Sequence, residues 1–220
     1  MGNTAPQPVP EGIRRARMPR PERERQMLEV AGRSFAERGF HAVSMDEIAA
    51  RAGISKPMLY QYFGSKEGLY VAFVRQQGTA LLEAMRDATE PGATPAEALK
   101  AGTLAFLGYV DEHRSGWELL YREAANQGGP LAAEIAALHA RIASIVHRLF
   151  MAVANDRSNE RTDALAHAFV GAGESVANWW LEHPEVPRGR VAELLVSLAC
   201  GALPELDDAV PSLTNRKTPR

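Results

Sequence analysis

Two lysines near the N-terminus stand where a helix could bind an anion. Lys56 and Lys66 each directly follow a serine, a residue favoured at helix N-caps. A cation at this end of the helix dipole is unfavourable by about 0.3 kcal/mol or more. An approaching phosphate reverses that sign, because the lysine and the unpaired helix amides attract the same anion. Ser44 offers a hydroxyl and helix amides in the same way. The pattern indicates phosphate binding; the alternative is that both lysines are only solvated.

The short helix expected after Ser55 has an unusual outward face. Leu59 and Phe63 share its inward side. Its outward positions are Lys56, Met58, Tyr60, Gln61 and Tyr62. Tyrosine hydroxyls can bind phosphate, and a methionine can contact a thymine methyl group. These residue types favour a DNA groove as the partner of this face; the alternative is that the two tyrosines are partly buried.

The elements around these residues form a recognisable order. A first helix is expected over 21–38, ended by Gly39. A second helix starts at Met45, behind a capping box made by Ser44 and Glu47, and ends at Gly53. The helix after Ser55 follows, and a fourth, longer helix extends from Ser65 to about Thr89. Two short helices joined by a glycine-containing turn, after a longer helix, are typical of a helix-turn-helix.

The segment 45–69 resembles the DNA-binding signature of the tetracycline-repressor (TetR) family, and the preceding residues 36–40 resemble the end of that family's first helix. The resemblance covers about Arg23 to Val74. It implies a dimer of nine or ten helices per chain, whose third helix enters the major groove. It implies base or groove contacts from Lys56, Pro57, Met58 and Tyr62, and phosphate contacts from Ser44, Tyr60 and Lys66. Ser55, the expected N-cap of the third helix, belongs to the same DNA-binding set. Met58 is bulkier than the small residue often found there.

Helical spacing continues through the rest of the chain, without strand or hairpin patterns. We therefore expect an all-α fold with about nine helices: a three-helix helix-turn-helix DNA-binding domain and a larger helical domain for ligand binding and dimerisation. The expected boundaries are a disordered arm at 1–20, the DNA-binding domain at 21–66, the effector and dimerisation domain at 67–204 and a flexible tail at 205–220. Residues 1–66 hold eleven Lys/Arg and seven Asp/Glu (+4), and residues 67–220 hold fourteen and twenty (−6). A basic head on an acidic body fits a polyanion partner.

Several other classes of protein are disfavoured by the sequence. It has no apolar run of membrane-span length and no signal-peptide pattern, so we expect a cytoplasmic protein without a membrane partner. A single cysteine, Cys200, excludes an internal disulfide framework. His139 and His147 are too far apart to share a metal easily, so neither a metal nor a cofactor is expected. No enzyme motif organises the polar residues. The alternatives are a helical enzyme or an interaction module that does not bind DNA.

Aromatic residues on several later helices are candidates to line a pocket for a small-molecule effector. They are Phe106, Tyr109, Trp117, Tyr121, Phe150, Phe169 and Trp179. The alternative is that they are ordinary core residues. An effector in such a pocket would release the protein from its operator, which makes a repressor the expected regulator.

The last two helices, expected over 162–182 and 188–203, are apolar on more than one face. A helix that is apolar nearly all round must be covered on both sides, and an isologous four-helix dimer interface would cover it. The residues expected in this interface are Val170, Gly173, Val176, Ala177, Leu194, Leu195 and Leu198. The alternative is that both helices fill the core of their own subunit.

Overall fold

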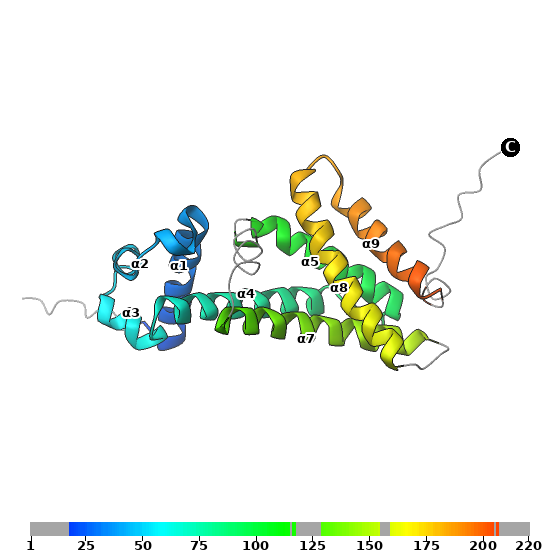
Figure 1. Cartoon of the computed structure of the whole chain (residues 1–220), viewed down its shortest axis with the longest axis horizontal. Coiled ribbons are helices and arrows are strands. Elements are labelled where there is room, and N and C mark those ends of the chain that lie inside the picture. The colour runs from blue at the N-terminus through cyan, green and yellow to red at the C-terminus, as the bar shows by residue number, and fades with distance from the viewer. Residues whose placement is uncertain (1–17, 115, 118–128, 155–158, 205, 207–220) are drawn as a thin grey trace, which may run out of the picture.

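The computed structural model describes residues 18–114, 116–117, 129–154, 159–204 and 206. These residues form eight helices and no strand, which confirms the all-α prediction (Figure 1). The helices are α1 (Arg20–Ala42), α2 (Met45–Ala52), α3 (Lys56–Phe63), α4 (Lys66–Asp87), α5 (Pro95–Glu112), α7 (Pro130–Val153), α8 (Asn159–Glu182) and α9 (Arg188–Ala202). Outside the described residues lie Tyr121, residues 1–17 of the expected arm, and residues 205 and 207–220 of the expected tail.

The first three helices and the start of α4 share one core. Met27, Phe35, Ile48, Leu59 and Leu69 are all buried in it. We call this unit the head. Helix α1 is longer than expected, because helical structure resumes after Gly39 and continues to Ala42. Gly39 itself breaks the helix with φ 79° and ψ 160°, so the stop predicted there is real but brief.

Helix α4 belongs to both halves of the molecule. Its 22 residues span ~33 Å at about 1.5 Å per residue. Phe73 packs against α1, where Gly32 leaves room for its ring: a Cβ at Gly32 would lie 2.3 Å from Phe73 Cε2. Farther along, Gly78 faces Leu138 of α7 at close range. The helix therefore connects the head to the larger body (Figure 1).

The body consists of α5, α7, α8 and α9 around the second half of α4. Helix α7 packs mainly on α8 and α4, and α5 packs mainly on α9 and α4. One buried cluster centres on Phe150, Ala166 and Leu203, and another on Leu107, Ala177 and Trp180. Two separate clusters, rather than one continuous core, leave space between the helices of the body.

Helix α7 combines unusual length with a largely apolar composition. It is long and apolar enough to cross a bilayer by length and composition, with a mean hydropathy of 1.3. The sequence showed no uninterrupted apolar run, because His139, Arg141 and Arg148 divide it. In the structure α7 packs against α8 and α4. Several of its large aliphatic side chains, among them Leu138, Ile142 and Ile145, line a cavity described below.

Candidate functional site

Serine caps fix the starts of the helices in the head. Ser44 Oγ accepts from Glu47 N at 3.2 Å, Ser55 Oγ from Met58 N at 3.4 Å, and Ser65 Oγ from Gly68 N at 3.0 Å. All three predicted N-caps are present. The predicted capping box at α2 is only half formed, because the Glu47 carboxylate accepts from Arg38 instead of from the Ser44 amide.

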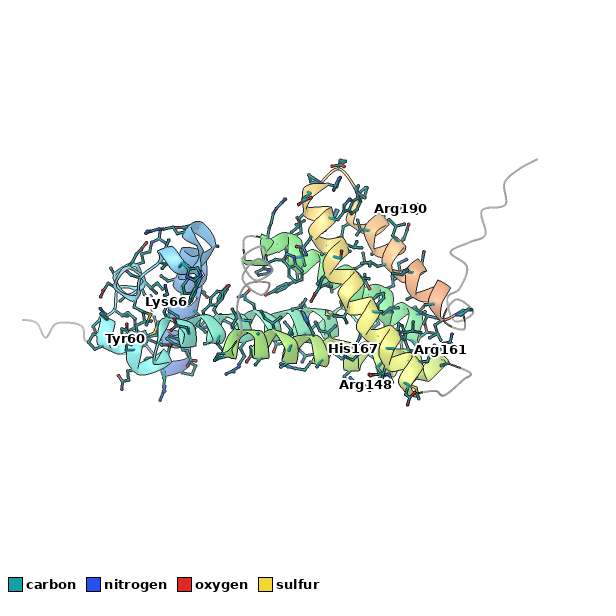
Figure 2. The ribbon with its side chains drawn as sticks, viewed as in Figure 1. Tyr60, Lys66, Arg148, Arg161, His167 and Arg190 are labelled. Carbon is teal, nitrogen blue, oxygen red and sulfur yellow. The ribbon has the colours of Figure 1, made fainter. Side chains whose placement is uncertain are left out.

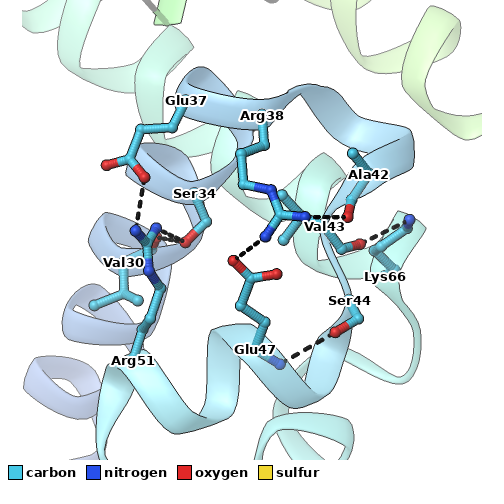
Figure 3. Close-up of polar contacts among 10 residues, drawn as sticks. All are labelled: Val30, Ser34, Glu37, Arg38, Ala42, Val43, Ser44, Glu47, Arg51 and Lys66. Carbon is cyan, nitrogen blue, oxygen red and sulfur yellow. Dashed lines mark hydrogen bonds and ion pairs between the residues drawn. The ribbon is translucent and has the colours of Figure 1, made fainter.

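Two arginines tie the helix-turn-helix to α1 (Figure 3). Arg38 of α1 donates to Glu47 Oε1 at 2.6 Å and to the carbonyl oxygen of Ala42 at 3.2 Å. Arg51 of α2 donates to Ser34 Oγ at 2.9 Å and to Glu37 Oε2 at 2.7 Å. Because each guanidinium spans two partners, α2 is held against α1 in one orientation, and α3 is presented from a rigid frame.

The outer face of α3 is exposed and carries the residues expected there. Leu59 is fully buried, while Met58 is 38% and Tyr60 42% exposed. Figure 2 shows Tyr60 at the outer side of the head. Gln61 is two residues from both Leu59 and Phe63, about 200° around the helix, so it points directly away from the core. Lys56 and Pro57 are exposed as well.

Lys56 does not stand alone on this face. Its Nζ lies 2.9 Å from Asp46 Oδ2 of α2, and both side chains are largely exposed. The hydrogen bond that Lys56 donates to Asp46, and the negative charge of Asp46, raise the pKa of Lys56 above its ordinary value. An exposed ion pair of this kind is weak. It can therefore exchange Asp46 for another anion at little cost.

Lys66 is placed differently from what the sequence indicated. Its Nζ donates to the carbonyl oxygens of Phe40 and Val43, both at 3.0 Å, and of His41 at 3.4 Å. It also lies 4.5 Å from the centre of the Phe40 ring. The lysine thus ties the start of α4 to the end of α1 (Figure 3). A phosphate contact from Lys66 would require it to leave these carbonyls.

Tyr62 is half-buried rather than fully outward. Its ring packs against the head core, and the Arg20 guanidinium carbon lies 5.3 Å from the ring centre. Arg20 is the first residue of α1. The arrangement brings a cation from the start of the described chain next to the helix that carries the exposed face.

Three residues of this surface were not in the predicted set. Gln61 was recognised as outward but not assigned a contact, and a helical wheel centred on Leu59 and Phe63 would have singled it out. Asp46 and Arg20 carry no local signal for their contacts. Their partners Lys56 and Tyr62 are brought to them only by the packing of α1, α2 and α3.

The body contains a cavity of about 1320 Å³. Helices α4, α5, α7 and α8, with Trp117 and Leu195, form its walls. Its lining is mainly apolar, with a few polar groups among the apolar ones. A concave, largely apolar site with a few polar groups is the usual form of a small-molecule site.

The structure brings only part of the predicted pocket set to this cavity. Phe106, Trp117 and Phe169 line it, and the first two rings meet edge to face at 5.5 Å. Phe150 is instead buried in the core beneath Phe169. Tyr109 does not line this cavity: its hydroxyl lies 2.6 Å from Gln77 Oε1 and 3.0 Å from the Gln77 carbonyl oxygen, either of which can accept its proton, and burial raises its pKa. Trp179 points to solvent and stacks on His183.

An ionisable pair lies on the cavity wall. His139 Nε2 of α7 contacts Glu174 Oε1 of α8. The hydrogen bond to Glu174 raises the pKa of His139, which favours the imidazolium form. The carbonyl oxygen of Glu174 accepts from the Asn178 side chain at 2.8 Å, and Asn178 Oδ1 accepts from Trp117 Nε1 at 3.1 Å. The pair is therefore connected to the aromatic wall.

The predicted dimer residues separate into two groups. Leu194 and Leu198 are 48% and 56% exposed on α9. Ala177 and Leu195 are buried within the subunit, Val170 and Gly173 line the cavity, and Val176 packs on the core beside Leu107. The structure thus places five of the seven inside the subunit, because α8 must cover both the cavity and the core of the body.

No group of three or more His, Cys, Asp or Glu side chains suited to a metal ion occurs in the described part of the chain. The polar residues of the head described above form caps and clamps, and those of the cavity wall include the His139–Glu174 pair with Asn178 and Trp117. What the geometry offers is a rigid, exposed helix face at one end and a large apolar cavity at the other.

The head and the body each match a known protein family. Residues 27–73 match the family described as bacterial regulatory proteins, tetR family, and residues 95–201 match the tetracyclin repressor-like C-terminal domain. The HTH-type transcriptional activator FasR of Mycolicibacterium smegmatis is 30% identical over 190 residues, which cover 85% of each chain.

Solved structures of TetR-family regulators are similar to this chain over most of its length. A TetR-like transcriptional regulator from Rhodococcus sp. RHA1 has 40% sequence identity and a TM-score of 0.68, over 84% of this chain and 98% of that one. A tetR-family transcriptional regulator from Streptomyces coelicolor has 25% identity and a TM-score of 0.69, over 87% and 88%. The head is therefore a helix-turn-helix DNA-binding domain, and this chain belongs to the TetR family of transcriptional regulators.

Proposed function

We propose that this protein represses transcription as a dimer that binds operator DNA through α3, and that a small molecule in the body cavity releases it. The observation that carries the proposal is the exposed outer face of α3 on a head clamped by Arg38 and Arg51. A solvated face has no need of an exposed methionine and tyrosine, whereas a DNA groove offers both of them partners.

The contacts follow from the position of each side chain on the head. Pro57, Met58 and Tyr62 would meet the groove, with Gln61 at the centre of the face, where its amide can pair with an adenine edge. Lys56 would exchange Asp46 for the DNA. Ser44, Ser55 and Tyr60 would position the backbone through phosphates. Lys66 would act mainly by holding α4 against α1, since its donors already have three carbonyl acceptors.

Dimerisation would use the outer surface of the last two helices. Trp179, Leu194 and Leu198 are exposed large apolar side chains there. The solvent side of α8 also carries a row of small residues, namely Ala164, Ala168, Gly171 and Ser175. Small residues allow helices to approach closely, and an isologous pairing of α8 and α9 would cover the leucines. The expected interface thus keeps Leu194 and Leu198 and loses the buried positions.

Helix α7 gives the cavity a direct connection to the head. Leu131, in its first turn, is buried in the head core, and Ile135 packs against that core while also lining the cavity. A ligand that moves α7 must therefore repack the head or shift it along α4. Two heads bind successive major-groove faces only at one separation, ~34 Å for half-sites one turn apart. A coupling of about 1–3 kcal/mol would then control DNA affinity.

Whether the protein represses or activates transcription can be tested separately. FasR, the M. smegmatis relative, is named an activator. Repression followed by release is the form that we propose here, with the protein acting in the cytoplasm. A reporter driven by the bound promoter distinguishes the two, because deletion of the gene raises expression of a repressed promoter and lowers that of an activated one.

The test is selection of bound fragments from sheared genomic DNA by the purified full-length chain, followed by footprinting. The proposal predicts a protected site with two related half-sites about 34 Å apart between centres. Gln61→Ala and Met58→Ala should alter the selected sequence, while Ala137→Ser on the exposed side of α7 should not. Recovery of no enriched sequence by a folded protein would instead favour an interaction module or an enzyme.

A further inference from the structure

We infer that the cavity binds an amphiphile with a long aliphatic chain and an acidic head group. The inference rests on the proposed role of the cavity as the effector site. Three features of the lining support it: a long aliphatic wall, an excess of arginine among the charged residues, and a contact with His139 that already occupies Glu174, one of the two cavity carboxylates among the described residues.

The wall is formed mainly by α7. Ile135, Leu138, Ile142, Ile145 and Leu149 all line the cavity. The fourteen steps from Ile135 to Leu149 correspond to ~21 Å along the helix axis. Pockets for drug-sized ligands hold about 300–1,000 Å³, and this cavity, at about 1320 Å³, is larger. A long apolar body fits a wall of this length better than a compact one.

The charges on the lining favour an anion. Arg86, Arg141 and Arg148 line the cavity, against the carboxylates of Glu83 and Glu174. Arg86 is paired with Asp87 at 3.0 Å. Arg148 donates to Ser144 Oγ, and within the described residues neither Arg141 nor Arg148 forms an ion pair with a carboxylate. Both are exposed residues of α7 that line the cavity, and Figure 2 shows Arg148 on that helix.

The carboxylate of Glu174 is compatible with an anionic ligand. It is in contact with His139, so the cavity does not present it as an unpaired acceptor for a ligand cation. The only other cavity carboxylate among the described residues, Glu83, is exposed on α4. An acidic head group would therefore find Arg141 and Arg148 in the lining, while its chain lies along α7.

The experiment is a calorimetric titration of the full-length protein, without DNA, against straight-chain carboxylates of increasing length below their micelle concentrations. Affinity should rise about fourfold for each added methylene while the chain still fits. The alcohol and the trimethylammonium compound of equal length should bind more weakly than the carboxylate. The variant Arg141→Gln/Arg148→Gln should lower carboxylate affinity about three- to tenfold and leave alcohol affinity within about twofold.

Two controls keep the outcome decisive. Arg141→Lys/Arg148→Lys keeps the charge and should restore most of the affinity. Arg190→Gln removes an arginine from the start of α9, outside the cavity lining, and should change nothing (Figure 2). Equal binding of alcohol and carboxylate, tighter binding of the cation, or a gain below about twofold per methylene would overturn the inference. Because no DNA is present, such a failure is distinct from a failure to bind an operator.

Discussion

Arg75 of α4 and Glu134 of α7 form a bidentate ion pair next to the head. Arg75 Nε lies 3.1 Å from Glu134 Oε1, and Nη2 lies 2.7 Å from Oε2. The pair joins the two helices that lead from the cavity to the head, and it sits one turn from Leu131, which is buried in the head core. The pair therefore lies where the ligand-driven movement of α7 that we propose would reach the head.

A double-mutant cycle measures this pair. Arg75→Ala, Glu134→Ala and the double variant, compared by the free energy of unfolding in urea, should give a coupling energy of about 0.2–1 kcal/mol. The Arg75 side chain is 63% exposed, which keeps the coupling in this surface range. Arg190 and Glu193 on α9 form a monodentate ion pair, which serves as the control and should give a smaller coupling energy.

Acid should remove the same coupling. The Arg75 hydrogen bond lowers the pKa of Glu134 from its ordinary value of 4.5. A carboxylate with a lowered folded pKa stabilises the fold fully above the unfolded pKa, and this contribution is lost as pH falls through the folded pKa. The coupling energy should therefore be constant from neutral pH to about pH 5 and decline below about pH 4.5. A coupling that persists unchanged under strong acid would contradict the ion-pair account.

Asp46 should limit the affinity of the head for DNA. It binds Lys56 at 2.9 Å and places a negative charge beside the expected groove contacts. Asp46→Asn removes a charge that repels phosphate, and because unit charges about 4 Å apart interact by about 1 kcal/mol in water, affinity should rise about fivefold. Fluorescence anisotropy with non-specific duplex DNA at low salt measures the change. Asp163→Asn on α8 is the matched control, and an equal rise in that variant would show that only net charge matters.

The local features of the head could be predicted from the sequence, whereas its tertiary contacts could not. The caps at Ser44, Ser55 and Ser65 depend on amides three residues away, so the residue order reveals them. Lys66 is different, because its carbonyl acceptors lie 23 to 26 residues earlier and reach it only through packing. The position of Lys66 at a helix N-terminus therefore does not reveal that its ammonium group is already held by backbone carbonyls.

In the body, periodicity identifies apolar positions but not what they face. Phe169 lines the cavity and Phe150 is buried beneath it, although both are aromatic residues on amphipathic helices. Leu194 is exposed, whereas its neighbour Leu195 is buried. Whether such a residue meets a core, a cavity or a second subunit depends on how the helices cross, and a single sequence does not record these angles.

Gly32 should be required for the packing of α4 on α1. An alanine there would place Cβ 2.3 Å from Phe73 Cε2, in a fully packed core. Overpacking of this kind costs about 1–3 kcal/mol, so Gly32→Ala should lower the unfolding free energy by that amount. Gly189→Ala on α9, where no atom lies within 4 Å of the added Cβ, should be neutral or stabilising. Thermal unfolding of both variants, followed by circular dichroism, would reject the close-packing account if their effects were equal.

The leucines exposed on α9 should decide the oligomeric state. Leu198→Asp places a charge on a side chain that is 56% exposed in the subunit, so an isolated subunit should tolerate it. If α8 and α9 form the interface, the variant should be monomeric in sedimentation at micromolar concentration and should bind DNA at least about tenfold more weakly, since avidity is lost. Ala137→Asp, exposed on α7, should remain dimeric. A dimeric Leu198→Asp protein would move the interface elsewhere.

The most direct test of the central claim is the salt dependence of binding to duplex DNA from the promoter of its own gene, for wild type, Lys56→Ala and Lys100→Ala. We predict tight binding that falls linearly with the logarithm of salt concentration, with Lys56→Ala reducing the slope by about one unit. Lys100→Ala, on α5 in the body, should keep the wild-type slope. Equal slopes for the two variants, or no binding by a folded dimer to this or to genomic DNA at low salt, would contradict the assignment of α3 as the DNA-reading element.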